Sequence, residues 1–167
     1  FCECLGTDPP VTEGLGLQGS DSFTETVPML DEDGAMTPTD VDRTLEVDIA
    51  RRWGTGYDSH VQSFVNIIAT PKGGTHVAGF ERALTRTVNE ALRSSRMLKS
   101  GEAPVIKDDI AEGLTAVVTV RLAEPQFEGQ TKEVLGTSAV SSLVAGIVDK
   151  QLKAVLTSTK RAEKASA

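Results

Sequence analysis

Residues 61–92 read VQSFVNIIATPKGGTHVAGFERALTRTVNEAL, and the spacing of apolar residues changes within this stretch. Up to Thr70 the segment is apolar on both faces of an extended chain, which predicts a central strand covered on two sides. After the Pro-Lys-Gly-Gly turn, apolar residues recur at helical spacing as far as about Met97, with Thr75 as the expected N-cap. The stretch therefore predicts a sheet combined with an amphipathic helix.

The flanking segments repeat the same two patterns. Residues 45–53 and 114–122 place alternate apolar side chains on one face, as half-buried strands do. A DEDG turn at residues 31–34 joins the first of these strands to an earlier one, so we expect a hairpin. The full set of further elements is a strand at 22–30, a short helical turn at 107–112 and a long helix at 138–160. This order predicts an α+β fold, with a mainly antiparallel sheet and helices packed on one face.

Length and composition indicate one domain. The chain has 167 residues, of which 39% are hydrophobic, enough for a single core. It starts at Phe1 rather than at a methionine, so we expect a piece of a longer polypeptide. Residues 1–20 are predicted to form an irregular or partly ordered lead-in from a truncated helix. Residues 21–160 would form the domain, and residues 161–167 a basic tail.

The net charge limits the classes of partner. Seventeen Lys and Arg residues against 24 Asp and Glu give a formal charge of −7, which disfavours wrapping by nucleic acid but permits a local basic face. The sequence has no apolar run of membrane-spanning length. Cys2 and Cys4 lack further metal ligands nearby and are predicted to be free thiols in a reducing cytoplasm.

The segment EPQFEGQTKEVLG, residues 124–136, places a lysine in a glycine-containing loop after the 114–122 strand. Lys132 could carry a point charge to a phosphate while the backbone near Gly129 adapts. The alternative is an ordinary solvated loop lysine, and the residues alone leave both open. We find no P-loop, nucleophile elbow or HExxH motif.

The remaining chemistry-bearing residues favour structural roles. His60 and His76 are expected to make local hydrogen bonds. The acidic run 31–33 could suggest a metal site, but its place in a glycine-containing turn favours a solvated turn. Tyr57 is expected to pack over the GTGYD turn.

Four arginines stand out on the predicted helix after Thr75. At about 100° per residue they fall within an arc of roughly 80°, almost opposite the apolar stripe. This ridge is either the solvated side of an amphipathic helix or a surface that meets nucleic-acid phosphates. Its members are Arg82, Arg86, Arg93 and Arg96.

The blocks SFVNIIAT, GGTHVAGF, EGLTAV and PQFEGQTK occur in this order. Together they closely resemble the transducer domain of the B-type, ATPase subunit of bacterial type IIA DNA topoisomerases, the family formed by the B-type subunits of DNA gyrase and topoisomerase IV. The resemblance covers about residues 21–160. PQFEGQTK is closer to the topoisomerase IV kind.

This resemblance implies a ribosomal protein S5 domain 2-like fold and a role in coupling. In the family, the QTK loop reaches ATP held by a separate GHKL domain, where the lysine contacts the γ-phosphate and the glutamine assists. Those residues correspond to Lys132 and Gln130. The resemblance further implies a bacterial cytoplasmic enzyme, a dimer with a second B-type subunit, an A-type DNA-cleaving subunit and double-stranded DNA.

The resemblance assigns no catalytic residue to this chain. It implies that ATP is bound mainly by the GHKL domain and that Mg²⁺ belongs to the parent enzyme rather than to these residues, so the isolated chain is expected to be inactive. Tyr57 does not correspond to the DNA-attacking tyrosine, which belongs to the partner subunit. A stand-alone nucleic-acid-binding module of S5-like fold and a passive structural domain remain as alternatives.

Overall fold

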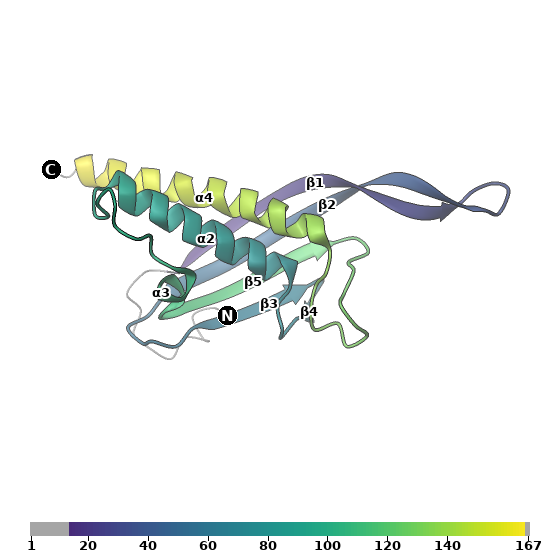
Figure 1. The fold of residues 1–167 in the computed structure, drawn as a ribbon, viewed down its shortest axis with the longest axis horizontal. Helices are drawn as coiled ribbons and strands as arrows, with labels where there is room; N and C mark the ends of the chain where they lie inside the picture. Colours follow the sequence, from purple (N-terminus) through teal and green to yellow (C-terminus); the bar gives the residue numbers. More distant parts are fainter. Residues whose placement is uncertain (1–13, 166–167) are drawn as a thin grey trace.

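The computed structural model describes residues 14–165, and their side chains as far as Ser158. Two long helices lie side by side on one face of a five-stranded sheet (Figure 1). The strands are β1 (Leu15–Leu30), β2 (Met36–Trp53), β3 (His60–Val65), β4 (Ile68–Ala69) and β5 (Leu114–Leu122), and the helices are α2 (Thr75–Ser94), α3 (Lys107–Ala111) and α4 (Ser138–Ala165). The predicted mixed fold, with a mostly antiparallel sheet and helices, is confirmed.

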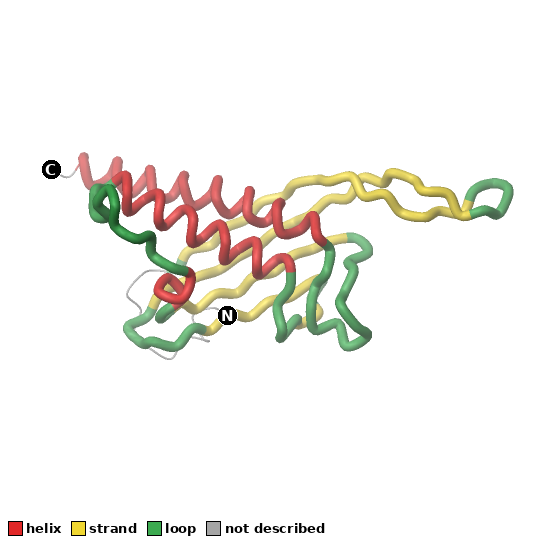
Figure 2. Tube along the Cα trace, in the orientation of Figure 1, coloured by secondary structure: helices red, strands yellow, loops and turns green. Residues whose placement is uncertain are grey.

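The sheet has the order β1-β2-β5-β3-β4. All neighbouring pairs are antiparallel except β3 and β5, which run parallel because α2 and α3 connect them and return the chain to the opposite end of the sheet. Figure 2 shows that the helical layer covers one side of the sheet. Inward residues of the central strands, such as Ile49 and Val118, pack with Phe80 of α2 and Val144 of α4 in one fully buried core.

The chain enters the sheet earlier than the sequence predicts. Residues 15–20, predicted to be an irregular lead-in, form the start of β1 and pair with β2. Gly19 belongs here for a physical reason, because a Cβ at this position would lie 2.6 Å from Ile147 of α4. The glycine thus marks a close approach of helix to strand rather than a loop. Residues 1–13, including Cys2 and Cys4, lie outside the described residues.

The predicted central strand at 61–70 is also corrected. It is a hairpin of β3 and β4, and Ile67 in its turn is 90% exposed. Asn66 and Ile67 both have positive φ, 48° and 66°, as two-residue hairpin turns require. The Asn66 side chain donates to the Leu122 carbonyl at 2.6 Å and accepts from its N–H at 2.9 Å. These two bonds to β5 stabilise a turn that the apolar pattern conceals.

Both ends of α2 differ from the prediction. Gly74 is the N-cap, and Thr75 is the first helical residue and makes no capping bond with its side chain. The helix stops at Ser94 because Arg96, with φ 59°, closes a Schellman-type end in which the Met97 N–H returns to the Leu92 carbonyl. A non-glycine residue in this position hides the stop signal from sequence reading.

Four smaller predictions have mixed outcomes. The short helix at 107–112 is confirmed as α3, and the 31–34 turn is confirmed as the hairpin end. Helix α4 continues to Ala165, so residues 161–165 do not form a separate tail. Tyr57 is 81% exposed, so the prediction that it packs over its turn is wrong. Within residues 14–165 no helix is both long and apolar enough to cross a membrane.

Candidate functional site

The loop from β5 to α4 folds back on itself as a small hairpin. Phe127 and Leu135 face each other in an antiparallel bridge. On either side, the Glu128 N–H donates to the Val134 carbonyl at 2.8 Å and the Gly136 N–H donates to the Gln126 carbonyl at 2.7 Å. The five residues 129–133 form the tip of this hairpin, which we call the QTK loop. The backbone of the QTK loop is therefore held by the hydrogen-bonded pair of segments at the base of the hairpin.

The base of the QTK loop is fastened to the segment that starts α2. The Leu135 N–H donates to the Gly73 carbonyl at 3.2 Å, and the Thr75 N–H donates to the Leu135 carbonyl at 3.0 Å. A further bond joins the Lys72 N–H to the Glu133 carbonyl at 3.2 Å. Leu135 is fully buried. The base of the loop is thus an extended segment that is hydrogen-bonded both to the glycine turn and to the start of α2.

Lys132 lies at the exposed tip of the loop in a left-handed backbone conformation, φ 55°. Its Nζ atom is 6.0 Å from the centroid of the Phe127 ring, at the edge of the range for a cation–π contact. Gln130 is also exposed, and Gly129 has φ 84°. Among the described residues no carboxylate forms an ion pair with Lys132. The tip therefore presents one unpaired cation and one amide to solvent.

The carboxylate of Glu133, the residue after Lys132, forms an ion pair with a different lysine, Lys72. Glu133 lies 2.6 Å from the Lys72 ammonium. The hydrogen bond and charge of Lys72, with a smaller contribution from the Thr131 hydroxyl, hold the pKa of Glu133 below its ordinary value. Sequence reasoning missed Lys72 and Glu133, because the two residues are far apart in the chain and neither belongs to a recognisable motif. Their pairing leaves the charge of Lys132 unneutralised.

A chain of buried polar side chains lies at the start of α2. The Ser63 and Thr70 hydroxyls are 2.7 Å apart, and Thr70 Oγ1 lies 3.2 Å from Nε2 of His76. Burial lowers the pKa of His76 to about 4, so the imidazole is neutral near pH 7. The prediction that His76 is a local hydrogen-bonding residue is confirmed.

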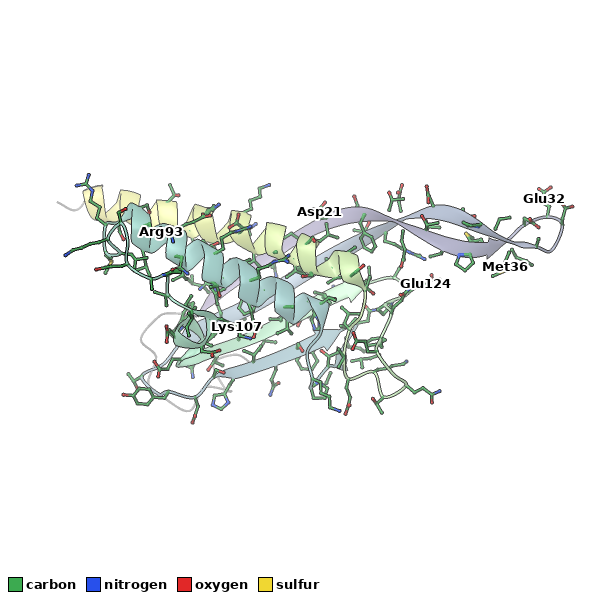
Figure 3. The ribbon with its side chains drawn as sticks, viewed as in Figure 1. Asp21, Glu32, Met36, Arg93, Lys107 and Glu124 are labelled. Carbon is green, nitrogen blue, oxygen red and sulfur yellow. The ribbon has the colours of Figure 1, made fainter. Side chains whose placement is uncertain are left out.

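The four arginines of the predicted ridge do not share one free surface. Arg82 reaches the Ser141 carbonyl of α4 at 3.5 Å, and Arg86 pairs with Asp149 of α4 at 3.2 Å. Arg93 is exposed near the end of α2, where Figure 3 labels it. Arg96 lies beyond the helix, so its predicted place on the helical ridge is wrong. Arg82 and Arg86 instead follow the seam between the two helices.

The same seam carries an ion-pair network. Asp149 accepts a hydrogen bond from the Thr87 hydroxyl at 2.8 Å and lies 3.1 Å from Lys153, which also pairs with Glu90. Burial raises the pKa of the Asp149 carboxyl, but Thr87, Lys153 and Arg86 together outweigh it and the pKa lies below its ordinary value. The network holds α2 and α4 together as a pair.

The acidic residues of the described chain do not gather into a metal centre. Within 14–165, no group of three or more His, Cys, Asp or Glu side chains is placed to hold a metal ion. In the acidic turn, Asp31 accepts from the N–H groups of Asp33 at 3.0 Å and Ala35 at 2.8 Å. These two bonds confirm that residues 31–33 lie in a turn.

A family model described as DNA gyrase B matches residues 16–166. The chain belongs to the DNA gyrase B family.

Relatives and solved structures agree with this assignment. The chain is 46% identical over 113 residues to the DNA gyrase B protein of Streptomyces coelicolor, covering 68% of this chain and 16% of that protein. It is 47% identical over 107 residues to the DNA gyrase B protein of Mycobacterium tuberculosis H37Rv, covering 64% and 16%. The chain therefore spans about a sixth of the length of these relatives.

Two solved structures share the fold. The 43K ATPase domain of Thermus thermophilus gyrase B, in complex with an aminocoumarin, has a TM-score of 0.73 at 25% identity and covers 96% of this chain and 38% of that one. The ATP-binding domain of topoisomerase IV from Francisella tularensis has a TM-score of 0.61 at 25% identity, covering 82% and 34%.

Proposed function

We propose that this chain is the nucleotide-sensing transducer of an ATP-dependent type II DNA topoisomerase of the bacterial cytoplasm, with a ribosomal protein S5 domain 2-like fold. In the parent enzyme it would couple ATP binding and hydrolysis in a GHKL domain to DNA gate movement. The partners are a second B-type subunit, an A-type DNA-cleaving subunit and double-stranded DNA. Whether the parent is a gyrase or a topoisomerase IV, the kind that PQFEGQTK resembles, stays a prediction.

The observation that carries this proposal is the unpaired Lys132 at the tip of an anchored loop. An exposed ammonium beside an exposed Gln130 amide fits a phosphate group presented by another domain. When bound, ATP would supply the γ-phosphate charge to which Lys132 is attracted. That attraction weakens once the phosphate leaves, and differential affinity of this kind shifts a domain equilibrium.

The base of the QTK loop would transmit a displacement of the Lys132 tip to the two helices. Leu135 is hydrogen-bonded to the start of α2 and lies just before Ser138, the first residue of α4. A displacement of the tip therefore acts on the beginnings of both helices. The Thr87–Asp149 bond and its ion pairs couple the helices further along their length. We infer that α2 and α4 move as one body toward the DNA-cleaving module.

The test is ATP hydrolysis by the full-length B-type subunit carrying Lys132→Ala, with and without DNA, and binding of a non-hydrolysable ATP analogue. We expect turnover to fall by ~10²-fold or more, the scale for removing one charge-stabilising contact. Lys150→Ala is the matched control, because Lys150 is also an exposed lysine but lies on α4, away from the QTK loop and its Lys72–Glu133 pair. Unchanged turnover and analogue binding in Lys132→Ala would return this residue to an ordinary loop lysine and contradict the proposal.

The arginines at the helical seam and at the end of α2 remain proposed DNA-facing residues. Arg86→Glu is unsuitable as a test, because the new carboxylate would face Asp149. Arg82→Glu with Arg93→Glu changes the surface charge without that effect. We expect loss of DNA stimulation of ATP hydrolysis and of strand passage. Unchanged values for both would exclude a DNA-facing role for these two residues.

A further inference from the structure

The β1–β2 hairpin projects beyond the rest of the molecule. Its pairing is continuous from Leu15↔Arg51 to Leu30↔Met36, whereas β5 pairs with β2 only over residues 45–53. Residues 22–44 therefore form a two-stranded extension without a third strand, which Figure 1 shows pointing away from the helices. We call it the acidic ribbon.

The acidic ribbon carries most of the net charge of the chain. It has six Asp or Glu residues and one arginine, a formal charge of −5, whereas the whole chain has −7. The remaining residues are close to neutral. The one arginine, Arg43, is used at the base of the ribbon, where it contacts Glu25 and Glu124. The outer part of the ribbon consequently has no cation to balance its carboxylates.

The end of the ribbon is apolar as well as acidic. Met29, Leu30 and Met36 are 48%, 70% and 60% exposed. The turn beside them is held by Asp31, whose N–H donates to the Ala35 carbonyl at 2.8 Å and whose carboxylate accepts two further N–H groups. Figure 3 shows Glu32 and Met36 at this far end. Exposed apolar side chains on a pre-ordered turn are typical of a contact that another molecule buries.

The ribbon edges are unsuited to adding a strand from another chain. Pro28 lies opposite Pro38, and neither has a backbone N–H to donate. Thr24 and Thr26 bond Asp42 and Asp40 across the two strands, at 2.9 and 2.6 Å, which occupies the side chains within the ribbon. The prolines disfavour strand addition at this point, so we place the contact at the apolar tip and its acidic border.

Charge decides what can occupy the tip. A net charge of −5 repels the phosphate backbone of DNA and repels a second copy of the same ribbon. An apolar pocket bordered by Lys and Arg is complementary to it. DNA-handling proteins are rich in such basic surfaces.

We propose that the tip of the acidic ribbon docks into an apolar, cation-bordered pocket on the DNA-cleaving subunit of the same enzyme. The inference rests on the proposed function for the identity of that subunit. It adds a contact that depends on Met29, Leu30, Met36 and the carboxylates of the turn.

The experiment measures the affinity of the full-length B-type subunit for the purified DNA-cleaving subunit over a range of salt concentrations. Leu30→Ser/Met36→Ser removes the apolar tip, and Glu32→Gln/Asp33→Asn removes charge but keeps Asp31 and its turn. Asp58→Asn/Glu112→Gln is the matched control, two exposed acids outside the ribbon. All of these side chains are exposed, so the variants are expected to fold, and circular dichroism checks this.

We expect the tip variant to bind about tenfold more weakly or worse, as for residues central to an interface. The charge variant should bind more weakly and with a shallower salt dependence, while the control is unchanged. Unchanged affinity in both ribbon variants overturns the inference. So does a tip variant that loses only self-association, because the occupant is then a second copy.

Strand passage by the wild-type subunit pair separates this inference from the proposed function. Active strand passage with unchanged ribbon-variant affinity contradicts the ribbon contact alone. A wild-type pair that neither associates nor passes DNA strands contradicts both.

Discussion

The backbone N–H of Thr75 donates to the carbonyl oxygen of Leu135 across 3.0 Å, which joins the first residue of α2 to the base of the QTK loop. The two residues are far apart in the sequence. The N–H of Leu135 also donates to the Gly73 carbonyl, so both main-chain groups of Leu135 are hydrogen-bonded to the start of α2. These bonds attach the base of an exposed loop directly to the helical layer. This attachment is the structural basis for proposing that a charge sensed at Lys132 reaches α2 and α4 together.

Substitution of Gly74 tests how tightly this junction is packed. Gly74 has φ 139°, and a Cβ there would lie 2.5 Å from the backbone nitrogen and oxygen of Leu135. We expect Gly74→Ala to lower the free energy of unfolding by about 2 kcal/mol or more, from backbone strain and displacement of the loop. Urea denaturation measures it. Gly16→Ala, where a Cβ meets nothing within 4 Å, is the control, and equal losses in the two variants would rule out the close contact.

His76 should make stability depend on pH. Its pKa is lowered from 6.5 to about 4 because burial disfavours the imidazolium. Between these values the unfolded chain binds a proton that the folded chain does not, so stability falls as pH is lowered from about 6.5 to 4. The loss is about 3 kcal/mol over that window. His76→Gln should remove this component from the unfolding free energy measured from neutral pH downward, and an identical pH dependence in the variant would contradict it.

The Arg86–Asp149 pair should contribute to the coupling of α2 to α4. The carboxylate is mostly buried but the guanidinium is half exposed, so solvent screens part of the interaction. A double-mutant cycle of Arg86→Met and Asp149→Asn should give an interaction energy of about 0.5–1 kcal/mol in thermal unfolding. Additive effects would show that the pair does not couple the helices.

Arg43 should hold the base of the acidic ribbon. Its side chain is only 11% exposed and contacts Glu25 and Glu124, and Gln126 also reaches Glu25 at 3.3 Å. Arg43→Met should therefore speed amide hydrogen exchange in residues 22–30 and 36–44 while leaving β5 protected. Exchange that rises equally in β5 would mean that the arginine supports the whole sheet instead.

The sequence was sufficient to predict the strands and helices whose apolar residues are regularly spaced. The alternation at 45–53 and 114–122 and the stripe on 75–94 predicted the main strands and helix, because burial of one face imposes a fixed period on the chain. The glycine-containing loop after a strand also marked Lys132, and the family resemblance added Gln130. Their role as a phosphate contact stays a prediction.

What the sequence concealed depends on contacts between distant residues or on unusual backbone angles. Asn66 follows the end of β3 and Arg96 follows the end of α2, and both have positive φ although neither is a glycine. The residue types at these positions therefore gave no signal that the strand or the helix ends. Gly19 lies in a strand, and the Ile147 side chain of α4 fills the space that a Cβ there would need.

By itself, then, the sequence determined the period and order of the elements and the charge available in each segment. Only the tertiary structure decided which charges remain free. Lys72 neutralises Glu133 and Asp149 neutralises Arg86, while Lys132 is left unpaired and the acids of residues 31–33 project from the body. The physical reason is that an ion pair needs two atoms within about 4 Å. Separation along the chain does not set that distance, whereas packing of the sheet, the loops and the two helices does.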